Sequence, residues 1–271
     1  MTENQAARGR VRLTLSAGLL LAVAACGQTA PPADAWRAET GTSALESGVS
    51  GVLQDEAGRP IAGARVLACM STVCFSDNTG PTGGFSFQID APNDVVIKTE
   101  ESLTTEWRRA AAMAPVRLSE ARMVDVGAVH MPTLPEGRPI GPARSDPQTV
   151  AAGDGLELTV HRSALTPPLG EVVVEAAARR LPEAFLPRYA ALVDEEVIAV
   201  YALHPFTATS KVPVGVRAPS NLPEGTRVQF RTISEIDGSL SEPVPGRASG
   251  TSVATDPSTG ITRLTYLVIT R

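Results

Sequence analysis

Residue types that could carry out chemistry are few in this sequence. The 271 residues include three His and three Cys. His130, His161 and His204 each stand alone at or near the end of an expected strand, where a solvated or singly hydrogen-bonded imidazole is the usual outcome. The Gly-x-Ser-x-Gly motif of serine hydrolases and the His-Glu-x-x-His motif of zinc proteases are both absent from the sequence. We therefore expect a protein that is not an enzyme, with no catalytic residues, no bound metal and no cofactor.

Two acidic groups could supply oxygen ligands to calcium. They are Asp77-Asn78 and Asp194-Glu195-Glu196. A tight calcium loop places oxygen ligands at alternating positions, and no Asp-x-Asp-x-Asp-Gly segment occurs in the sequence. Solvated turns explain both groups better, and calcium binding stays an open alternative.

Cys69 and Cys74 form a pair separated by Met70-Ser71-Thr72-Val73. Strand-like residues flank this segment on both sides, so a hairpin would bring the two sulfur atoms opposite each other. In an exported protein the pair is expected to form a structural disulfide. The alternatives are one half of a metal site or two free buried thiols.

Cys26 follows an export signal. A basic segment with three arginines precedes the apolar run Leu13–Ala25, which is shorter than the roughly 20 residues that a membrane-spanning helix needs. The run ends in Val23-Ala24-Ala25-Cys26, which resembles the lipobox of bacterial lipoproteins. The resemblance implies a signal peptide over residues 1–25 and acylation, including palmitate, at Cys26. The alternative is an ordinary secretory signal.

Gly27 stands where inner-membrane lipoproteins often carry Asp, which favours the outer membrane. We therefore expect a lipid-anchored protein of the bacterial cell envelope. Its expected partners are the membrane, through lipidated Cys26, and an extracellular glycan or an envelope protein. A formal charge of −5 argues against a nucleic-acid partner.

Trp107 is the best candidate for a ligand-binding aromatic residue. The chain has 6 Phe, 2 Trp and 3 Tyr, too few for broad stacking surfaces. Trp107 lies beside Arg108 and Arg109 in a segment, 104–109, that is expected to be a strand. The alternative is that Trp107 belongs to the core.

The elements that would position these residues are short strands. Phe85, Phe87 and Ile89 alternate with polar residues, a period of two that predicts a half-buried strand. Similar patterns recur over residues 48–132 and 149–271, and Pro and Gly residues fill 133–148. We expect an all-β fold with two tandem antiparallel β-sandwich domains, joined by the 133–148 linker and preceded by a lipidated flexible tether over 26–47. Two short runs, 106–112 and 175–180, are possible helices.

The first of these domains resembles a known family. Val49–Val66, which contains Asp55, Gly58, Pro60 and Gly63-Ala64, is similar to the opening of the carboxypeptidase regulatory-like domain. The segments 76–80, 83–87 and 124–129 are similar to later parts of that domain. The resemblance implies a transthyretin-like β-sandwich with a non-catalytic accessory role, related to starch-binding-like folds. Residues 149–271 resemble ZU5-type β-rich surface modules more weakly.

These observations lead to a functional prediction. The leading hypothesis is a non-catalytic, lipid-anchored envelope protein with a structural, adhesive or ligand-presenting role. The alternative is a carbohydrate-binding accessory lipoprotein that uses Trp107. A third hypothesis is an enzyme that uses a pair of carboxylates, which the sequence alone does not pair.

Overall fold

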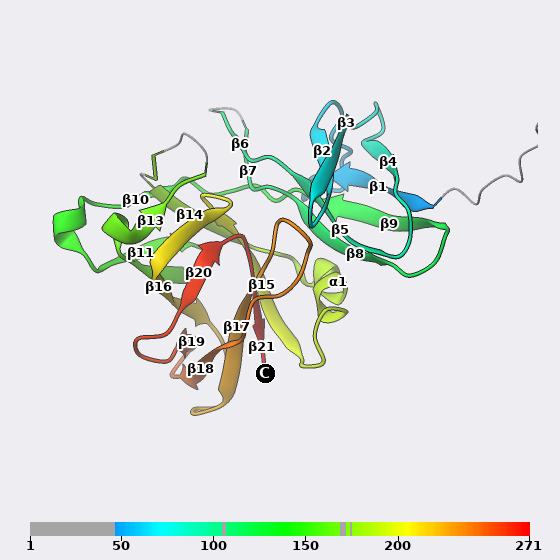
Figure 1. Cartoon of the computed structure of the whole chain (residues 1–271). Helices are drawn as coiled ribbons and strands as arrows, with labels where there is room; N and C mark the ends of the chain where they lie inside the picture. Colours follow the sequence, from blue (N-terminus) through cyan, green and yellow to red (C-terminus); the bar gives the residue numbers. More distant parts are fainter. Residues whose placement is uncertain (1–46, 105–106, 169–171, 174) are drawn as a thin grey trace, which may run out of the picture. The chain divides into compact units, whose positions relative to one another are not determined.

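The computed structural model describes residues 47–104, 107–168, 172–173 and 175–271. The expected signal peptide, Cys26 and the tether up to residue 46 lie outside the described residues. Strands make up most of the described chain, and the helices are short (Figure 1). The prediction of an all-β fold is confirmed.

Two sheets enclose the first core. The three-stranded sheet has the order β4-β1-β9, and the four-stranded sheet has the order β3-β2-β5-β8. Buried apolar residues of both sheets, among them Phe85, Phe87 and Val95, form one cluster. In the predicted alternating strand, Phe85 and Phe87 are buried and Ser86 and Gln88 are exposed, which confirms the pattern. These strands are β1 (Gly48–Gln54), β2 (Arg65–Met70), β3 (Val73–Asn78), β4 (Gly84–Gln88), β5 (Asn93–Thr99), β8 (Met113–Leu118) and β9 (Met123–His130).

The pairing of β1 with β9 is parallel, which corrects the prediction of a wholly antiparallel sandwich. Parallel neighbours need a long crossover connection between them. Here the chain between β1 and β9 contributes β4 and the whole four-stranded sheet before it returns beside β1.

The predicted disulfide is present. Cys69 of β2 and Cys74 of β3 lie directly opposite each other in the hairpin, with their Cα atoms 4.0 Å apart. The bridge therefore fastens the turn end of this hairpin.

The segment around Trp107 differs from the expected strand over 104–109. The structure has two short paired strands instead, β6 (Ser102–Leu103) and β7 (Arg108–Arg109), and Trp107 lies just before β7. Residues 107–112 are not helical. Ala110 donates its backbone N–H to Pro132, and Ala112 donates to the hydroxyl of Thr99, so the buried alanines stay extended.

The second half of the described chain is one large sheet in which every strand pair is antiparallel. Its order is β10-β14-β15-β21-β17-β18-β19-β16-β12-β11, with β13 and β20 also paired to β16. The strands are β10 (Arg138–Pro139), β11 (Gln148–Gly153), β12 (Leu156–Val160), β13 (Leu165–Thr166), β14 (Glu175–Arg180), β15 (Val197–His204), β16 (Ala208–Pro219), β17 (Arg227–Ile233), β18 (Val244–Ser249), β19 (Ser252–Thr255), β20 (Ile261–Leu264) and β21 (Tyr266–Thr270).

The helices of this half are short. The run 175–180, expected as a possible helix, is strand β14, because its alanines are buried between β10 and β15. The α-helix α1 (Leu186–Ala190) is a single turn, and three 3-10 helices are η1 (Ala143–Ser145), η2 (Arg162–Ala164) and η3 (Glu183–Phe185).

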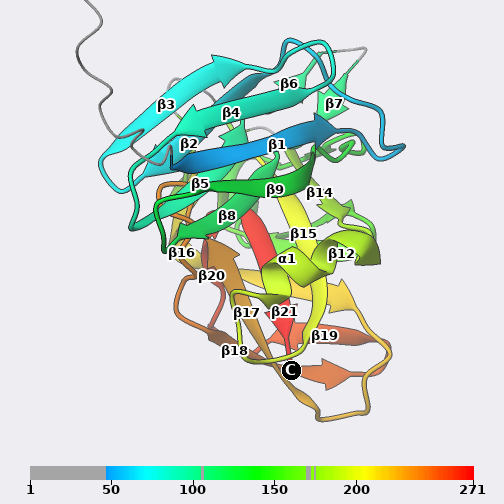
Figure 2. The ribbon, with the colours of Figure 1, turned by 90° about the vertical axis from the view of Figure 1, so that its right-hand side faces the viewer.

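Residues 45–271 form a single compact unit. A buried cluster joins residues of both halves, including Val96 and Met113 from the first and Val200 and Val268 from the second. Figure 2 shows the strands of the first half lying against α1, β15 and β21. Within the segment 133–148, Leu134 and Ile140 are buried.

Candidate functional site

Trp107 lies at a cavity of about 360 Å³ in the first half of the chain. The lining comes from the approach to β2, from the end of β5 and the start of β6, and from Trp107, Arg109 and Met131. This volume is within the range of pockets that hold small ligands. The cavity therefore contains the residue that the sequence singled out for binding.

Trp107 is 53% exposed, so it is not a core residue. Its backbone N–H donates to the Thr104 hydroxyl at 3.1 Å, which fixes the start of β7. The guanidinium carbon of Arg109 lies 4.6 Å from the ring centroid. Because Arg109 covers one face of the ring, the exposed area belongs to the other face and the ring edges.

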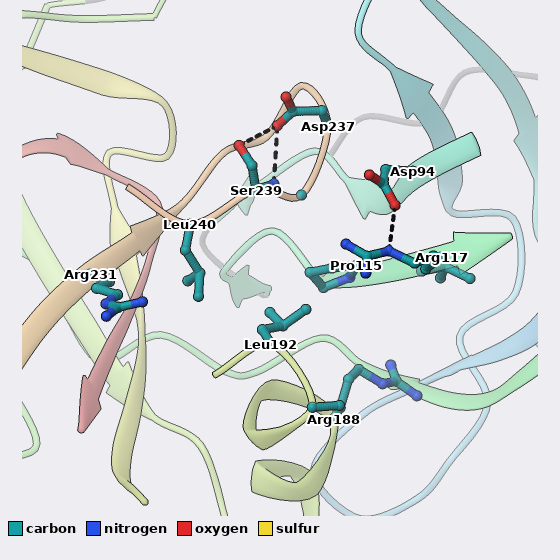
Figure 3. Close-up of a pocket in the computed structure, with 12 residues that line it drawn as sticks. Asp94, Pro115, Arg117, Arg188, Leu192, Arg231, Asp237, Ser239 and Leu240 are labelled. Atoms are coloured by element: carbon teal, nitrogen blue, oxygen red, sulfur yellow. Dashed lines mark hydrogen bonds and ion pairs between the residues drawn. The ribbon is translucent and has the colours of Figure 1, made fainter. Parts of the chain in front are cut away.

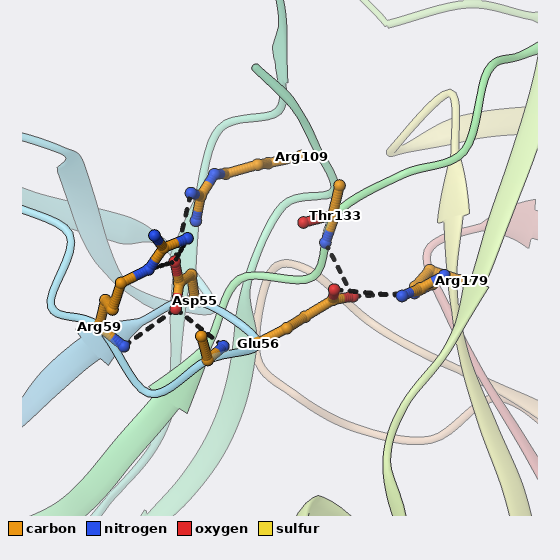
Figure 4. A network of polar contacts seen from close by, with 7 residues as sticks. Asp55, Glu56, Arg59, Arg109, Thr133 and Arg179 are labelled. Carbon is orange, nitrogen blue, oxygen red and sulfur yellow. Dashed lines mark hydrogen bonds and ion pairs between the residues drawn. The ribbon is translucent and has the colours of Figure 1, made fainter. Parts of the chain in front are cut away.

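Arg109 is held in turn by the carboxylate of Asp55 (Figure 4). The two side chains are 8% and 7% exposed, and their nearest charged atoms are 3.8 Å apart. Burial raises the pKa of Asp55. Hydrogen bonds from the backbone N–H and the side chain of Arg59 and from the backbone N–H of Ala57 lower this pKa by more, so the net shift is a decrease. Asp55 therefore stays ionised. Its negative charge balances the positive charge of the Arg109 guanidinium, which lies against the indole ring.

The neighbouring residue Glu56 links the two halves. Arg179 of β14 donates its Nε to Glu56 at 2.8 Å, and the backbone N–H of Thr133 donates to the same carboxylate (Figure 4). The turn that carries Asp55 is therefore anchored on the second half as well as on the first.

A second polar network lies behind the cavity. The Nδ1 atom of His204 is 2.8 Å from Oε2 of Glu101, which lines the cavity. The other ring nitrogen of His204 is 3.8 Å from Glu175, and Glu175 accepts a hydrogen bond of 2.6 Å from Arg108. Charged groups of both halves therefore meet next to the Trp107 cavity.

Among the described residues, two that line the cavity each have one buried polar atom without a hydrogen-bond partner. They are Nη1 of Arg109 and Oε1 of Glu101. A buried polar group that lacks a partner costs about 1–3 kcal/mol, and more when it is charged. One of these atoms is a donor and the other is an acceptor.

Sequence reasoning identified Trp107 but not Glu101. Glu100-Glu101 resembles a solvated acidic turn, and Glu100 does pair with Arg65 in an exposed salt bridge. Glu101 instead is only 12% exposed, and its partner His204 stands 103 residues later in the chain. No local signal could have revealed that contact.

The remaining candidate residues are dispersed. His130 is buried against the ring of Phe185, and His161 precedes η2. Glu195 pairs with Arg231 and Glu196 with Arg271, so this acidic group is engaged in ion pairs. Within the described residues, no three His, Cys, Asp or Glu side chains are grouped to hold a metal ion. None of the helices in the described part of the chain is long and apolar enough to span a bilayer.

Comparisons with known proteins found distant likenesses. No family model and no curated protein matches the chain. It is 11% identical to a Streptococcal ancillary pilin, with a TM-score of 0.30 over 82% of this chain and 63% of the pilin. It is 9% identical to a candidate carbohydrate binding protein from Bacteroides uniformis, with a TM-score of 0.19 over 83% of this chain and 79% of that one. The chain thus spans less than two thirds of the pilin's length, and neither likeness places it in a family.

Proposed function

We propose that this chain is a non-catalytic binding protein of the bacterial cell envelope, anchored through lipidated Cys26, and that it binds an extracellular glycan at the Trp107 cavity. The observation that carries the proposal is the half-exposed indole ring held in place over Arg109, beside a ligand-sized cavity. An adhesive or ligand-presenting role would follow from the same contact.

The chemistry of the cavity suits a sugar. The apolar C–H face of a pyranose stacks on an aromatic ring, and its hydroxyl groups both donate and accept hydrogen bonds. Glu101 can accept from one hydroxyl, and Arg109 can donate to another. Both of these atoms are buried, so a hydroxyl would reach them only after a small local movement.

The polar groups near the cavity support binding better than catalysis. Glu175 is engaged by Arg108, and Asp55 by Arg59 and Arg109. These carboxylates stabilise the contact between elements. A glycosidase instead needs two carboxylates that flank one scissile bond.

The proposal is tested by screening the full-length chain against a glycan array, followed by titration of the best glycan. We expect Trp107→Ala to weaken binding about fivefold or more, because aromatic stacking contributes ~1 kcal/mol beyond the area that it buries. Phe75→Ala is the matched control, since Phe75 is also an exposed aromatic residue, at 45%, and does not line the cavity. No binding to any glycan, or equal effects of the two substitutions, would overturn the proposal.

A further inference from the structure

The carboxylate of Glu101 has two oxygen atoms with different surroundings. Oε2 lies 2.8 Å from Nδ1 of His204, and Oε1 is buried without a hydrogen-bond partner in the described part of the chain. Glu101 lines the Trp107 cavity, and its side chain is 12% exposed. One oxygen of this group is therefore held by the protein, and the other is left to accept a hydrogen bond.

A second and larger cavity, of about 540 Å³, is lined by carboxylates of a different kind (Figure 3). Asp94 accepts a hydrogen bond of 3.0 Å from Nε of Arg117. Asp237 accepts from the backbone N–H and the hydroxyl of Ser239, within its own turn. Among the described residues of the two cavities, Glu101 is thus the carboxylate that keeps a buried oxygen without a partner.

His204 belongs to a firmly held part of the second half. It is the last residue of β15, a strand bonded to β14 on one side and to β21 on the other, and its own ladder partner is Ala177. Its side chain is 5% exposed. Glu101 precedes β6, a strand of two residues that pairs with β7. Because the sheet holds His204 more firmly than β6 holds Glu101, the imidazole positions the carboxylate.

The hydrogen bond of His204 is directed to Glu101 and not to Glu175. An ionised carboxylate only accepts hydrogen bonds, so Nδ1 of His204 carries the proton of the 2.8 Å contact. Nε2 of the same ring lies 3.8 Å from Oε1 of Glu175, beyond hydrogen-bond distance, and that oxygen accepts a bond of 2.6 Å from Arg108. The imidazole therefore holds Glu101 through one defined atom.

We propose that His204 is a positioning residue of the Trp107 cavity. Its Nδ1–H holds Oε2 of Glu101, so that Oε1 accepts a hydrogen bond from one hydroxyl group of the bound glycan after the small local movement that access requires. This role rests on the proposed function and adds a requirement to it, since one particular hydroxyl group must act as a donor. The binding site of the first half is thus completed by a side chain of the second half.

Fluorine distinguishes the two roles that a hydroxyl group can have. A C–F group is close in size to C–OH, accepts hydrogen bonds weakly and cannot donate them. At the position that faces Glu101, fluorine would leave Oε1 buried without a donor, and an unsatisfied buried acceptor is costly. The loss of affinity on fluorination should therefore be largest at one ring position.

The test is titration of the full-length chain, followed by NMR, with the methyl glycosides of glucose, galactose, mannose and N-acetylglucosamine. The glycoside of highest affinity is then compared with its monodeoxyfluoro analogues. One analogue should bind about tenfold or more weakly than its parent, because hydrogen bonds to charged groups are among the stronger ones. Equal affinities of all the analogues would overturn the proposal.

Two substitutions separate positioning from folding. His204→Leu removes the donor, and His204→Asn keeps one, because the side-chain nitrogen of Asn is bonded to Cγ as Nδ1 of His is. We expect His204→Leu to weaken binding of the parent glycoside about fivefold or more and to remove the penalty of the critical fluoro analogue, and His204→Asn to restore both. Glu175→Gln is the matched control, since Glu175 is the other acidic neighbour of His204 and does not line the cavity.

The possible outcomes separate this role from the proposed function. The same fluoro penalty in His204→Leu and in the wild type would exclude His204 as a positioning residue, while glycan binding stands. A His204→Asn protein that unfolds in urea like the wild type but does not recover binding would exclude it as well. If the wild type binds none of the four glycosides, the positioning role is overturned, and the glycan array with Trp107→Ala decides the proposed function separately.

Discussion

His130 is a buried imidazole, and within the described part of the chain neither of its ring nitrogens has a hydrogen-bond partner. Its ring stacks on Phe185, with the centroids 4.3 Å apart. Burial lowers the pKa of His130, and the nearby carboxylates of Glu56 and Asp55 only partly oppose that decrease, while Arg179 adds to it. The folded protein therefore holds this residue in its neutral form.

The position of His130 predicts an acid-sensitive stability. The unfolded chain binds a proton below the ordinary His pKa of 6.5, and the folded chain does not until a lower pH. Stability from this residue is therefore fully present above pH ~6.5 and is lost as the pH falls below it. Urea unfolding at a series of pH values should show His130→Phe with a smaller loss of stability on acidification than the wild type. His161 lies in a half-buried position, and His161→Phe is the control for loss of an imidazole elsewhere in the chain. If the free energy of unfolding of His130→Phe falls with pH as steeply as that of the wild type, this assignment is wrong.

At the scale of elements, the hairpin of β2 and β3 depends on its disulfide. Every residue of β3 is exposed, and β3 is the edge strand of its sheet. Few buried contacts therefore hold it in place.

Replacing Cys69 and Cys74 together with Ala should lower the free energy of unfolding by about 2 kcal/mol, the value expected for a short cross-linked loop. Hydrogen exchange should rise in β3 first, while β5 and β8 keep their protection. Mass spectrometry of unreduced wild-type peptides should show Cys69 joined to Cys74. Two alkylatable thiols in that experiment, or unchanged exchange in the variant, would be inconsistent with the bridge.

The elements also show how far sequence patterns could reach. The alternation in β4 and the Cys hairpin are local, since each depends on residues within about ten positions, and both were predictable. The alanines of β14 favour a helix on their own, and they are a strand because β10 and β15 pair with them. In the same way, the parallel pairing of β1 with β9 and the contact of Glu101 with His204 depend on segments far apart in the chain.

At the scale of the whole molecule, two tyrosines connect the halves of the unit 45–271. The hydroxyl of Tyr189 donates to the carbonyl of Met113 at 2.8 Å, and that of Tyr266 donates to the carbonyl of Ala111 at 3.0 Å. Burial raises the pKa of both phenols, so each remains a donor. These two bonds therefore pair the buried carbonyls of Ala111 and Met113 beside the apolar cluster that joins the halves.

Attachment to the membrane is the prediction that concerns the whole protein. Acylation of Cys26 should retain it in the membrane fraction, since each buried methylene contributes about 0.8 kcal/mol. Cys26→Ala should move the protein to the soluble fraction when cells are fractionated. Cys74→Ala serves as the control for loss of a cysteine as such. A Cys26→Ala protein that stays with membranes would exclude the lipid anchor.

The place of β1 has a mechanical consequence. β1 is the strand that follows the segment containing Cys26, and it lies in the middle of its sheet, bonded to β4 on one side and to β9 on the other. If the protein is tethered through that segment, a pull on it enters along the axis of β1. Such a load shears both ladders together, and their backbone hydrogen bonds must fail collectively rather than one by one. A protein loaded in this way would resist mechanical unfolding without any change in its equilibrium stability.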